Sequence, residues 1–358
     1  MNFTVLTVDL VRVESYAEAY SRSYQAHFVR LKMTSERARP ARLTLITPVF
    51  NESPNIDACA DAVTRVIFAD PEIDGRVIFV DDGSSDDSWA KIETLAQRSS
   101  RFSGVRLSRN FGAHYALTAG FDHVEPNQDV VATLACDLQD PPETVLDFIL
   151  EWRNGADIVW GARRERADSW PRKTASHILN YVLRRYAMPK NSRFRTGSFL
   201  LMDRTAFDCF LQYREHNRVT FALVAWTGFN QATVPYDRKA RIHGATRWSF
   251  GQMLNTAYDV FIGFSPVPAK FVAMLGFTVF TGSILFLLYL LITWSVTDVE
   301  PGWTGIMTMM TVLFGLLFMM VGMLAEYLYR IFIETKRRPL YFVSKRTKPA
   351  PLRPESDV

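Results

Sequence analysis

The fold is decided by a stretch in which a strand-like run ends and a helix-like run begins, Ala135-Cys136-Asp137-Leu138-Gln139-Asp140-Pro141-Pro142-Glu143. Apolar residues 130–134 precede it and the helix-like run 145–152 follows it. Asp137 and Gln139 therefore stand at the end of a strand, where parallel α/β sheets bind their ligands. Carboxylate and amide oxygens suit a hard cation such as Mg²⁺ or Mn²⁺ that holds phosphates. The stretch predicts a metal site formed by Asp137 and Gln139.

The end of the same stretch has a structural interpretation as the start of a helix. Asp140 would be the N-cap, Pro141 the first helical residue and Glu143 the partner of Asp140 in a capping box. We expect this role for Asp140 and Glu143. It does not account for Asp137 or Gln139, which precede the cap.

Short apolar runs alternate with helix-like segments on both sides of this stretch. They predict strands at 43–47, 77–80, 105–107, 130–134 and 157–160, with helices between them. Such alternation predicts an α/β fold with a doubly wound, mostly parallel sheet. Residues 166–250 are more polar and rich in Arg, and we expect them to complete the same domain with a helix at 175–186 and strands at 196–202 and 229–234.

The composition limits the class of protein. The chain has 358 residues and a formal net charge of +4, which gives no reason to expect a nucleic-acid partner. Its three cysteines, Cys59, Cys136 and Cys209, are far apart, which argues against a disulfide framework or a structural zinc site. No basic start with an apolar core occurs near the N-terminus, so we do not expect a cleaved signal peptide.

The chain becomes strongly apolar towards its C-terminus. Residues 271–294 and 303–325 carry no charge, and about 20 apolar residues suffice to cross a bilayer. The connector holds Asp298 and Glu300, whereas basic residues lie before the first run and after the second. By the positive-inside rule, both ends of the pair are cytoplasmic. The sequence therefore predicts two membrane spans and an N-terminal domain inside the cell.

Four motifs occur in order along the first half of the chain, Pro48-Val49-Phe50-Asn51-Glu52, Val80-Asp81-Asp82-Gly83-Ser84-Ser85-Asp86, Arg109-Asn110-Phe111-Gly112 and the stretch 137–143. Together with two spans, they resemble the family 2 glycosyltransferases that load a sugar onto a polyprenyl phosphate, the dolichol-phosphate mannose synthase type. The similarity covers roughly residues 41–335. It implies a GT-A-like fold, a nucleotide-sugar donor linked to UDP or GDP, and a polyprenyl phosphate acceptor such as undecaprenyl phosphate.

The resemblance also implies donor contacts at the ends of the first strands. Pro48, Glu52 and Asp82 would contact the nucleoside and Arg109 the phosphates, with Mg²⁺ or Mn²⁺ on the carboxylate–amide pair named above. Asp82 has an alternative role as the cap of the next helix. Arg109 has an equal alternative in a pair with a surface carboxylate.

A basic segment at 238–248 resembles the family element R-x-x-R-x-x-G-x-S-K-Y/W. The resemblance implies acceptor-phosphate contacts by Arg238, Arg241, Thr246 and Arg247. Arg241 and Arg247 would act with Asp137 in catalysis, which neutralises charge on the incoming phosphate and the leaving diphosphate. The ordinary alternative is a positive-inside flank beside anionic lipid.

Some residues depart from the family pattern. Ala135 replaces the first Asp of D-x-D-L-Q, and Arg195 and Ser198 replace acidic residues of a later motif. These changes motivate an alternative in which the chain is a degenerate, non-catalytic nucleotide-sugar-binding membrane protein. A processive polysaccharide synthase is disfavoured because Gly244 occupies the Gln position of Q-x-x-R-W.

The resulting prediction is a multi-pass protein of the inner (cytoplasmic) membrane that makes a lipid-linked sugar for cell-envelope glycan modification. Its expected parts are an N-terminal extension (1–40), a cytoplasmic glycosyltransferase domain (41–248), a juxtamembrane amphipathic helix (249–268), two transmembrane helices (269–330) and a basic cytoplasmic tail (331–358). The juxtamembrane helix would lie in the membrane interface, or alternatively on the soluble domain. Gly315 and Gly322 suggest a homo-oligomer through packed small residues.

Overall fold

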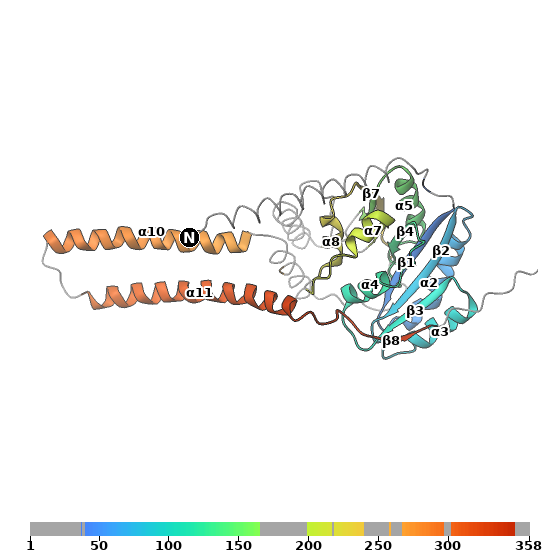
Figure 1. Ribbon diagram of the computed structural model, residues 1–358, viewed down its shortest axis with the longest axis horizontal. Coiled ribbons are helices and arrows are strands. Elements are labelled where there is room, and N and C mark those ends of the chain that lie inside the picture. Colours follow the sequence, from blue (N-terminus) through green and yellow to red (C-terminus); the bar gives the residue numbers. More distant parts are fainter. Residues whose placement is uncertain are drawn as a thin grey trace, which may run out of the picture.

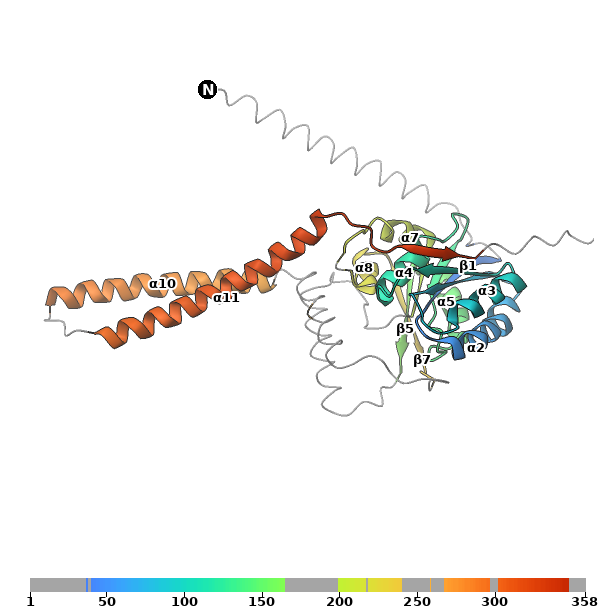
Figure 2. The same ribbon diagram turned by 90° about the horizontal axis from the view of Figure 1, so that it is seen from below.

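A central sheet carries helices on both faces, and two long helices lie side by side and point away from it (Figure 1, Figure 2). The computed structural model describes residues 37, 40–164, 199–216, 218–239, 258, 267–296 and 302–347. The predicted helix at 175–186 lies outside these residues, and so does almost all of the predicted juxtamembrane helix.

The first half of the described chain alternates strands with helices. Its elements are β1 (Ala41–Val49), α2 (Ser53–Val63), β2 (Ile73–Asp81), α3 (Ser88–Arg98), β3 (Phe102–Leu107), α4 (Ala113–Phe121), β4 (Val130–Thr133), α5 (Glu143–Arg153) and β5 (Ile158–Arg163). A π-helical turn over Thr64–Phe68 continues α2. β1 and β2 are longer than the apolar runs that predicted them, because the residues at their ends also pair in the ladder.

The second half adds shorter elements and the two long helices. They are β6 (Leu200–Asp203), α7 (Arg204–Phe210), α8 (Thr220–Trp226), β7 (Gln231–Tyr236), α10 (Val267–Val296), α11 (Trp303–Thr335) and β8 (Val343–Arg346). β6 and β7 fall within or beside the predicted strands at 196–202 and 229–234.

The described strands form one sheet in the order β7-β5-β6-β4-β1-β2-β3-β8. β1 is parallel to β2 and β4, β2 to β3, and β5 to β7, whereas β6 and β8 run antiparallel to their neighbours. The predicted fold class, a GT-A-like doubly wound, mostly parallel sheet, is confirmed. The strand order reverses between β1 and β4, and ligands of such sheets bind at that switch point.

Two apolar cores lie on opposite faces of the sheet. Successive side chains of a strand point to opposite faces, so Leu45 and Phe79 pack with α2, α3 and α5, whereas Ile46 and Val80 pack with α4, α7 and α8. β1 is buried at almost every position, as expected for a strand that is covered on both faces.

α10 and α11 are apolar but are not covered by the rest of the described chain. Phe277 is 70% exposed and Phe318 is 71% exposed. Both helices are long and apolar enough to cross a bilayer, which indicates association with a membrane. A Cβ added at Gly315 or Gly322 would meet no described atom within 4 Å, so these glycines do not serve the contact between the two helices.

The chain returns to the sheet after α11, within the segment predicted as a basic tail. β8 pairs with β3, and Val105 lies opposite Arg346. Beyond the ladder, the Gly104 N–H donates to Thr347 Oγ1 at 2.9 Å. β8 is charged and mostly exposed, as edge strands often are, so hydrophobic patterning did not predict it.

Gly120 allows close packing of α4 on the central strands. A Cβ at Gly120 would lie 2.3 Å from Ile46 Cγ2 and 3.0 Å from Val80 Cγ2. We expect Gly120→Ala to lower the free energy of unfolding by about 1–3 kcal/mol, the usual cost of overpacking a core. Denaturant unfolding of the purified protein in detergent measures this change.

The matched control removes the methyl group that the new Cβ would meet. Ile46→Ala alone should destabilise the protein, but the double variant should lose less stability than the sum of the two single variants. Additive losses would contradict the close contact between Gly120 and Ile46.

Candidate active site

The loops after β1 and β2 form one hydrogen-bonded unit. Val49 and Asp81 lie opposite each other at the strand ends. The Asn51 N–H donates to Ser84 Oγ, and the Ser85 N–H donates to Asn51 Oδ1, both at 2.8 Å. Asn51 has a positive φ of 51°, and these two bonds hold it there. The first two sequence motifs therefore meet at one end of the sheet, as expected for loops that follow neighbouring parallel strands.

The Asp82 carboxylate connects this unit to the third motif. Its oxygens accept hydrogen bonds from the N–H groups of Phe111 (2.7 Å) and Gly112 (2.8 Å). Burial raises the pKa of Asp82, and the two N–H donors partly offset this rise. Asp82 does not cap α3, whose N-cap is Asp87, so that alternative is wrong. The contact of Asp82 with a nucleoside stays a prediction.

Gly83 allows the second and third motifs to touch. Its φ is +72°, and an added Cβ would lie 2.5 Å from the Arg109 carbonyl carbon. Both the left-handed backbone and the lack of space require glycine. The close approach brings the Arg109 loop against the turn that follows β2.

Arg109 is exposed at the edge of this arrangement. Its guanidinium lies 3.9 Å from the centroid of the Phe111 ring, and Nη1 donates to the Asn110 carbonyl at 3.0 Å. Within the described residues no carboxylate forms an ion pair with Arg109, so the alternative of a surface ion pair is not found there. The stacked guanidinium can still bind an anion.

The loop after β4 brings the predicted metal ligands beside the basic segment. Leu138 has a φ of +54°, and the Gln139 N–H donates to Asp137 Oδ1 at 3.2 Å. Gln139 Oε1 accepts a hydrogen bond from Arg238 Nη2. The Gln139 carbonyl also accepts from the Lys239 N–H at 2.9 Å. One predicted metal ligand therefore contacts one predicted acceptor-phosphate residue directly.

Asp140 does not have the predicted role. α5 begins at Glu143 with Pro142 as its N-cap, and no side chain caps it, so the capping box is wrong. Asp140 is buried and accepts a hydrogen bond of 2.5 Å from the Tyr236 hydroxyl. The same hydroxyl accepts from Arg163 Nε at 3.2 Å. Burial and the Asp140 charge raise the pKa of Tyr236 to about 12, so it stays a donor at neutral pH.

Glu52 follows β1 and Asp137 follows β4, and these two strands are neighbours at the switch point. The pKa of the buried Cys136 thiol is raised by its hydrogen bond to Cys59, by burial, and by the charges of Glu52 and Asp137. Both carboxylates therefore act on the Cys136 thiol. This places the predicted nucleoside-binding residue Glu52 and the predicted metal ligand Asp137 in one region.

The described part of the candidate site provides few protein ligands for a metal ion. Among the described residues, no three His, Cys, Asp or Glu side chains gather in a metal-binding group. Asp137 offers a carboxylate, and Gln139 offers an amide oxygen that also accepts the hydrogen bond from Arg238. Mg²⁺ binds through few protein ligands when substrate phosphates supply the others. The residues fit an ion that binds together with a diphosphate, and do not fit a closed protein cage.

Of the remaining predicted residues, Pro48 belongs to the described part of the chain. Pro48 lies in β1 opposite Val80 of β2, one residue before the end of the strand. Arg241, Thr246 and Arg247 lie outside the described residues, as do Arg195 and Ser198.

Comparison with known proteins gives the family. The model of the glycosyl transferase family 2 matches residues 44–211. An uncharacterized glycosyltransferase of Synechocystis is 33% identical over 307 residues, which cover 84% of this chain and 94% of that protein. The chain belongs to glycosyltransferase family 2.

Other relatives of this family 2 glycosyltransferase have more specific names. An undecaprenyl-phosphate 4-deoxy-4-formamido-L-arabinose transferase of Edwardsiella ictaluri is 32% identical over 311 residues, covering 84% of this chain and 93% of that protein. Among solved structures, a mannosyltransferase of Pyrobaculum calidifontis in complex with GDP-Man and Mn²⁺ has a TM-score of 0.40 at 19% identity, covering 64% of this chain and 66% of that chain. The resemblance read from the four motifs is confirmed, and the protein is an enzyme.

The Asp82 bridge predicts a loss of stability when its carboxylate is removed. We expect Asp82→Ala to lower the free energy of unfolding by about 1–3 kcal/mol, because it leaves the two N–H groups of the third motif without their partner. Asp82→Asn keeps one acceptor and should lose less. Asp87→Ala, at an exposed residue whose side chain makes no capping bond, is the control and should change stability by under about 0.5 kcal/mol. Equal losses in Asp82→Ala and Asp87→Ala would contradict the bridge.

His114, in the first turn of α4, was not predicted from the sequence. Its Nδ1 accepts from the Thr220 N–H at 3.3 Å. Burial and the charge of Arg218 lower the pKa of His114 from 6.5 to about 4. The unfolded chain therefore takes up a proton near pH 6.5 that the folded protein does not take up until about pH 4.

The sign of the resulting pH dependence follows from this depressed pKa. The contribution of neutral His114 to the free energy of unfolding is fully present above pH 6.5. It is lost as the pH falls towards 4, which lowers the free energy of unfolding by up to about 3 kcal/mol. Urea unfolding at several pH values should show a smaller acid loss for His114→Gln, which cannot be protonated. An identical pH profile for both proteins would show that His114 does not titrate as a buried neutral group.

Proposed function

We propose that this glycosyltransferase transfers a sugar from a UDP- or GDP-linked donor to a polyprenyl phosphate, with inversion at the anomeric carbon. The acceptor proposed is undecaprenyl phosphate, and the reaction takes place at the cytoplasmic face of the inner membrane. The product would supply sugar for modification of cell-envelope glycans.

The observation that carries this proposal is the contact between the loop after β4 and the basic segment. Arg238 donates to the side chain of Gln139, and the Lys239 N–H donates to its carbonyl. A leaving diphosphate on the Asp137 loop and an incoming lipid phosphate beside Arg238 would therefore meet at one place. Such proximity is what a displacement between two phosphate-bearing substrates requires.

The named relatives and the apolar helices support the choice of acceptor. Relatives from Edwardsiella ictaluri and Proteus mirabilis carry the name undecaprenyl-phosphate 4-deoxy-4-formamido-L-arabinose transferase. α10 and α11 would place the domain beside the bilayer that holds such a lipid. The basic residues Lys270, Lys336, Arg337 and Arg338 at the domain side of the helices favour a cytoplasmic domain.

Each residue of the site has a proposed task. Pro48, Glu52 and Asp82 would contact the nucleoside, and Arg109 would bind its phosphates. Asp137 and Gln139 would hold Mg²⁺ or Mn²⁺, which when bound neutralises charge on the leaving diphosphate. A phosphate monoester is largely ionised near neutral pH, so the acceptor needs no strong general base.

The basic segment would bind the acceptor. Arg238, Arg241, Thr246 and Arg247 are the proposed contacts of the lipid phosphate, and Arg241 and Arg247 would act with Asp137 in the chemical step. Arginine suits this role because its planar guanidinium binds phosphate through two hydrogen bonds.

The proposal predicts a metal-dependent transfer that Asp137→Ala abolishes. Inside-out membrane vesicles with undecaprenyl phosphate, Mn²⁺ or Mg²⁺, and a panel of radiolabelled UDP- and GDP-sugars should move label into extractable lipid. We expect Asp137→Ala and EDTA to lower the rate by at least about 100-fold, as expected when charge stabilisation of the leaving group is lost. Asp147→Ala, at an exposed carboxylate of α5, should keep the activity.

The outcomes separate the proposal from its alternative. Transfer from one donor that occurs in inside-out vesicles, and not in right-side-out vesicles, would support both the proposed reaction and the proposed membrane face. Saturable nucleotide-sugar binding without transfer from any donor would instead favour the degenerate binding protein, for which Ala135, Arg195 and Ser198 are the motivating residues.

A further inference from the structure

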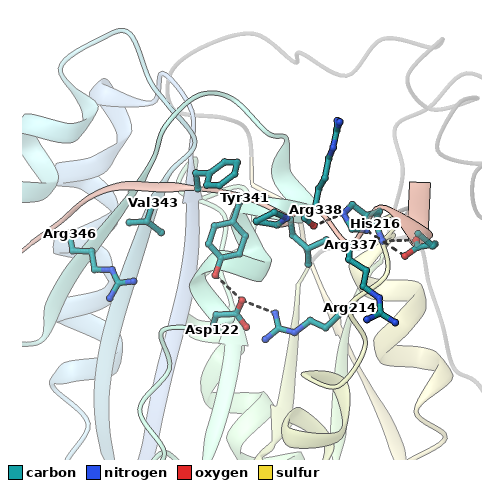
Figure 3. A pocket seen from close by; sticks show the side chains of 12 residues that line it. Asp122, Arg214, His216, Arg337, Arg338, Tyr341, Val343 and Arg346 are labelled. Atoms are coloured by element: carbon teal, nitrogen blue, oxygen red, sulfur yellow. Dashed lines mark hydrogen bonds and ion pairs between the residues drawn. The ribbon is translucent and has the colours of Figure 1, made fainter. Parts of the chain in front are cut away.

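An open cleft lies where the end of α11 turns into β8, and Figure 3 shows its side chains. Its volume is about 730 Å³, within the range of small-molecule sites. None of the residues that line it belongs to the four motifs or to the basic segment at 238–248. The cleft includes the last turn of the apolar helix α11 and the residues that follow it, so it lies where that helix joins the domain.

The carboxylates in this cleft are already engaged. Asp122 accepts a hydrogen bond from the Tyr341 hydroxyl at 2.7 Å and forms an ion pair with Arg214 at 2.8 Å, as the dashed lines in Figure 3 show. Glu334 accepts from the His216 N–H at 2.7 Å. Both acidic groups therefore serve to join the end of α11 and the strand β8 to the rest of the domain.

The Arg residues of the cleft outnumber the carboxylates that could neutralise them. Four Arg residues and two carboxylates line it, but Figure 3 shows the Arg338 side chain pointing away, which leaves an excess of one positive charge when His216 is neutral. In the described part of the chain, Arg337, Arg338 and Arg346 form no ion pair with a carboxylate. All three are exposed. The cleft therefore offers guanidinium groups to an anion from solution or from the membrane surface.

The backbone conformation of Arg337 is a second indication that the cleft is a binding site. Arg337 follows the C-cap of α11 and has a φ of +48°, at a position where glycine is usual. A side chain in this left-handed conformation is less stable than one in a relaxed backbone. Strained residues of this kind concentrate at ligand-binding sites. The chain places an arginine where a glycine would fit with less strain.

We propose that this cleft binds a phosphate group, carried either by an anionic lipid headgroup at the membrane surface or by a soluble phosphate ester. Arginine forks bind phosphate oxygens through paired hydrogen bonds. The excess positive charge of the cleft suits the negative charge of a phosphate group, whether in a lipid diester or in a soluble ester. The inference does not depend on the proposed transfer reaction, because the cleft shares no residue with that site.

The test uses the full-length protein in nanodiscs. One arm titrates inorganic phosphate, at constant ionic strength, onto protein in phosphatidylcholine nanodiscs. The other arm compares these nanodiscs with nanodiscs that contain phosphatidylglycerol. A ligand that binds the folded protein raises its melting temperature, so we expect a saturable rise in at least one arm. A rise with phosphate identifies a soluble source, and a rise with phosphatidylglycerol identifies a lipid.

Three variants connect the response to the cleft. Arg346→Gln should weaken the response by about tenfold, the effect of losing one charged hydrogen bond. Lys345→Gln removes the same charge from the same strand, but its side chain points to the opposite face, and it should bind like the wild type. Arg337→Gly should also weaken the response while the melting temperature without ligand stays equal or rises, which separates lost binding from lost folding.

Two results would overturn the proposal. One is the lack of a saturable response in both arms. The other is an equal response in Arg346→Gln, Arg337→Gly and Lys345→Gln, which would assign the effect to general surface charge or to a phosphate bound at another site.

Discussion

The buried carboxylate of Asp82 is the constraint on which the candidate active site depends. It is only 3% exposed, and it ties the turn after β2 to the N–H groups that open α4. Beside it, the fully buried Asp81 is compensated by Arg106 at 3.1 Å and by the Ser84 N–H at 2.8 Å. Two adjacent buried carboxylates are stable only when such partners are present. The loops are therefore ordered before a ligand binds, which is how proteins stabilise charge at low reorganisation cost.

In the described chain, non-glycine residues with positive φ occur in the two loops of the candidate active site and at the cleft after α11. The non-glycine residues with positive φ there are Asn51, Leu138 and Arg337. Asn51 is held by Ser84 and Ser85, and the loop of Leu138 is anchored two residues later by the bond between Asp140 and Tyr236. Conformations of this kind persist only when their surroundings determine them. The hydrogen bonds around the two loops of the candidate active site hold Asn51 and Leu138 in these conformations.

The strand pattern and the four motifs predicted the mostly parallel sheet and the family, because these depend on local periodicity and local turns. The role of Asp140 was predicted wrongly because its partner Tyr236 lies 96 positions away in the chain, and a buried phenol competes successfully with a helix N-terminus. The contact between Gln139 and Arg238 could not be predicted from the sequence either, because these residues are 99 positions apart in the chain. β8 carries no apolar alternation, and its pairing with β3 depends on where α11 ends.

The position of β8 has a consequence for how the protein is made. Its edge of the sheet, including the bond between Gly104 and Thr347, joins residues separated by 243 positions. β8 follows both apolar helices in the chain, so the ribosome must synthesise them before the free edge of β3 can be covered. Until that moment the domain has an open strand, the kind of edge that recruits other chains. Completion of the enzyme domain is therefore coupled in time to synthesis of its two apolar helices.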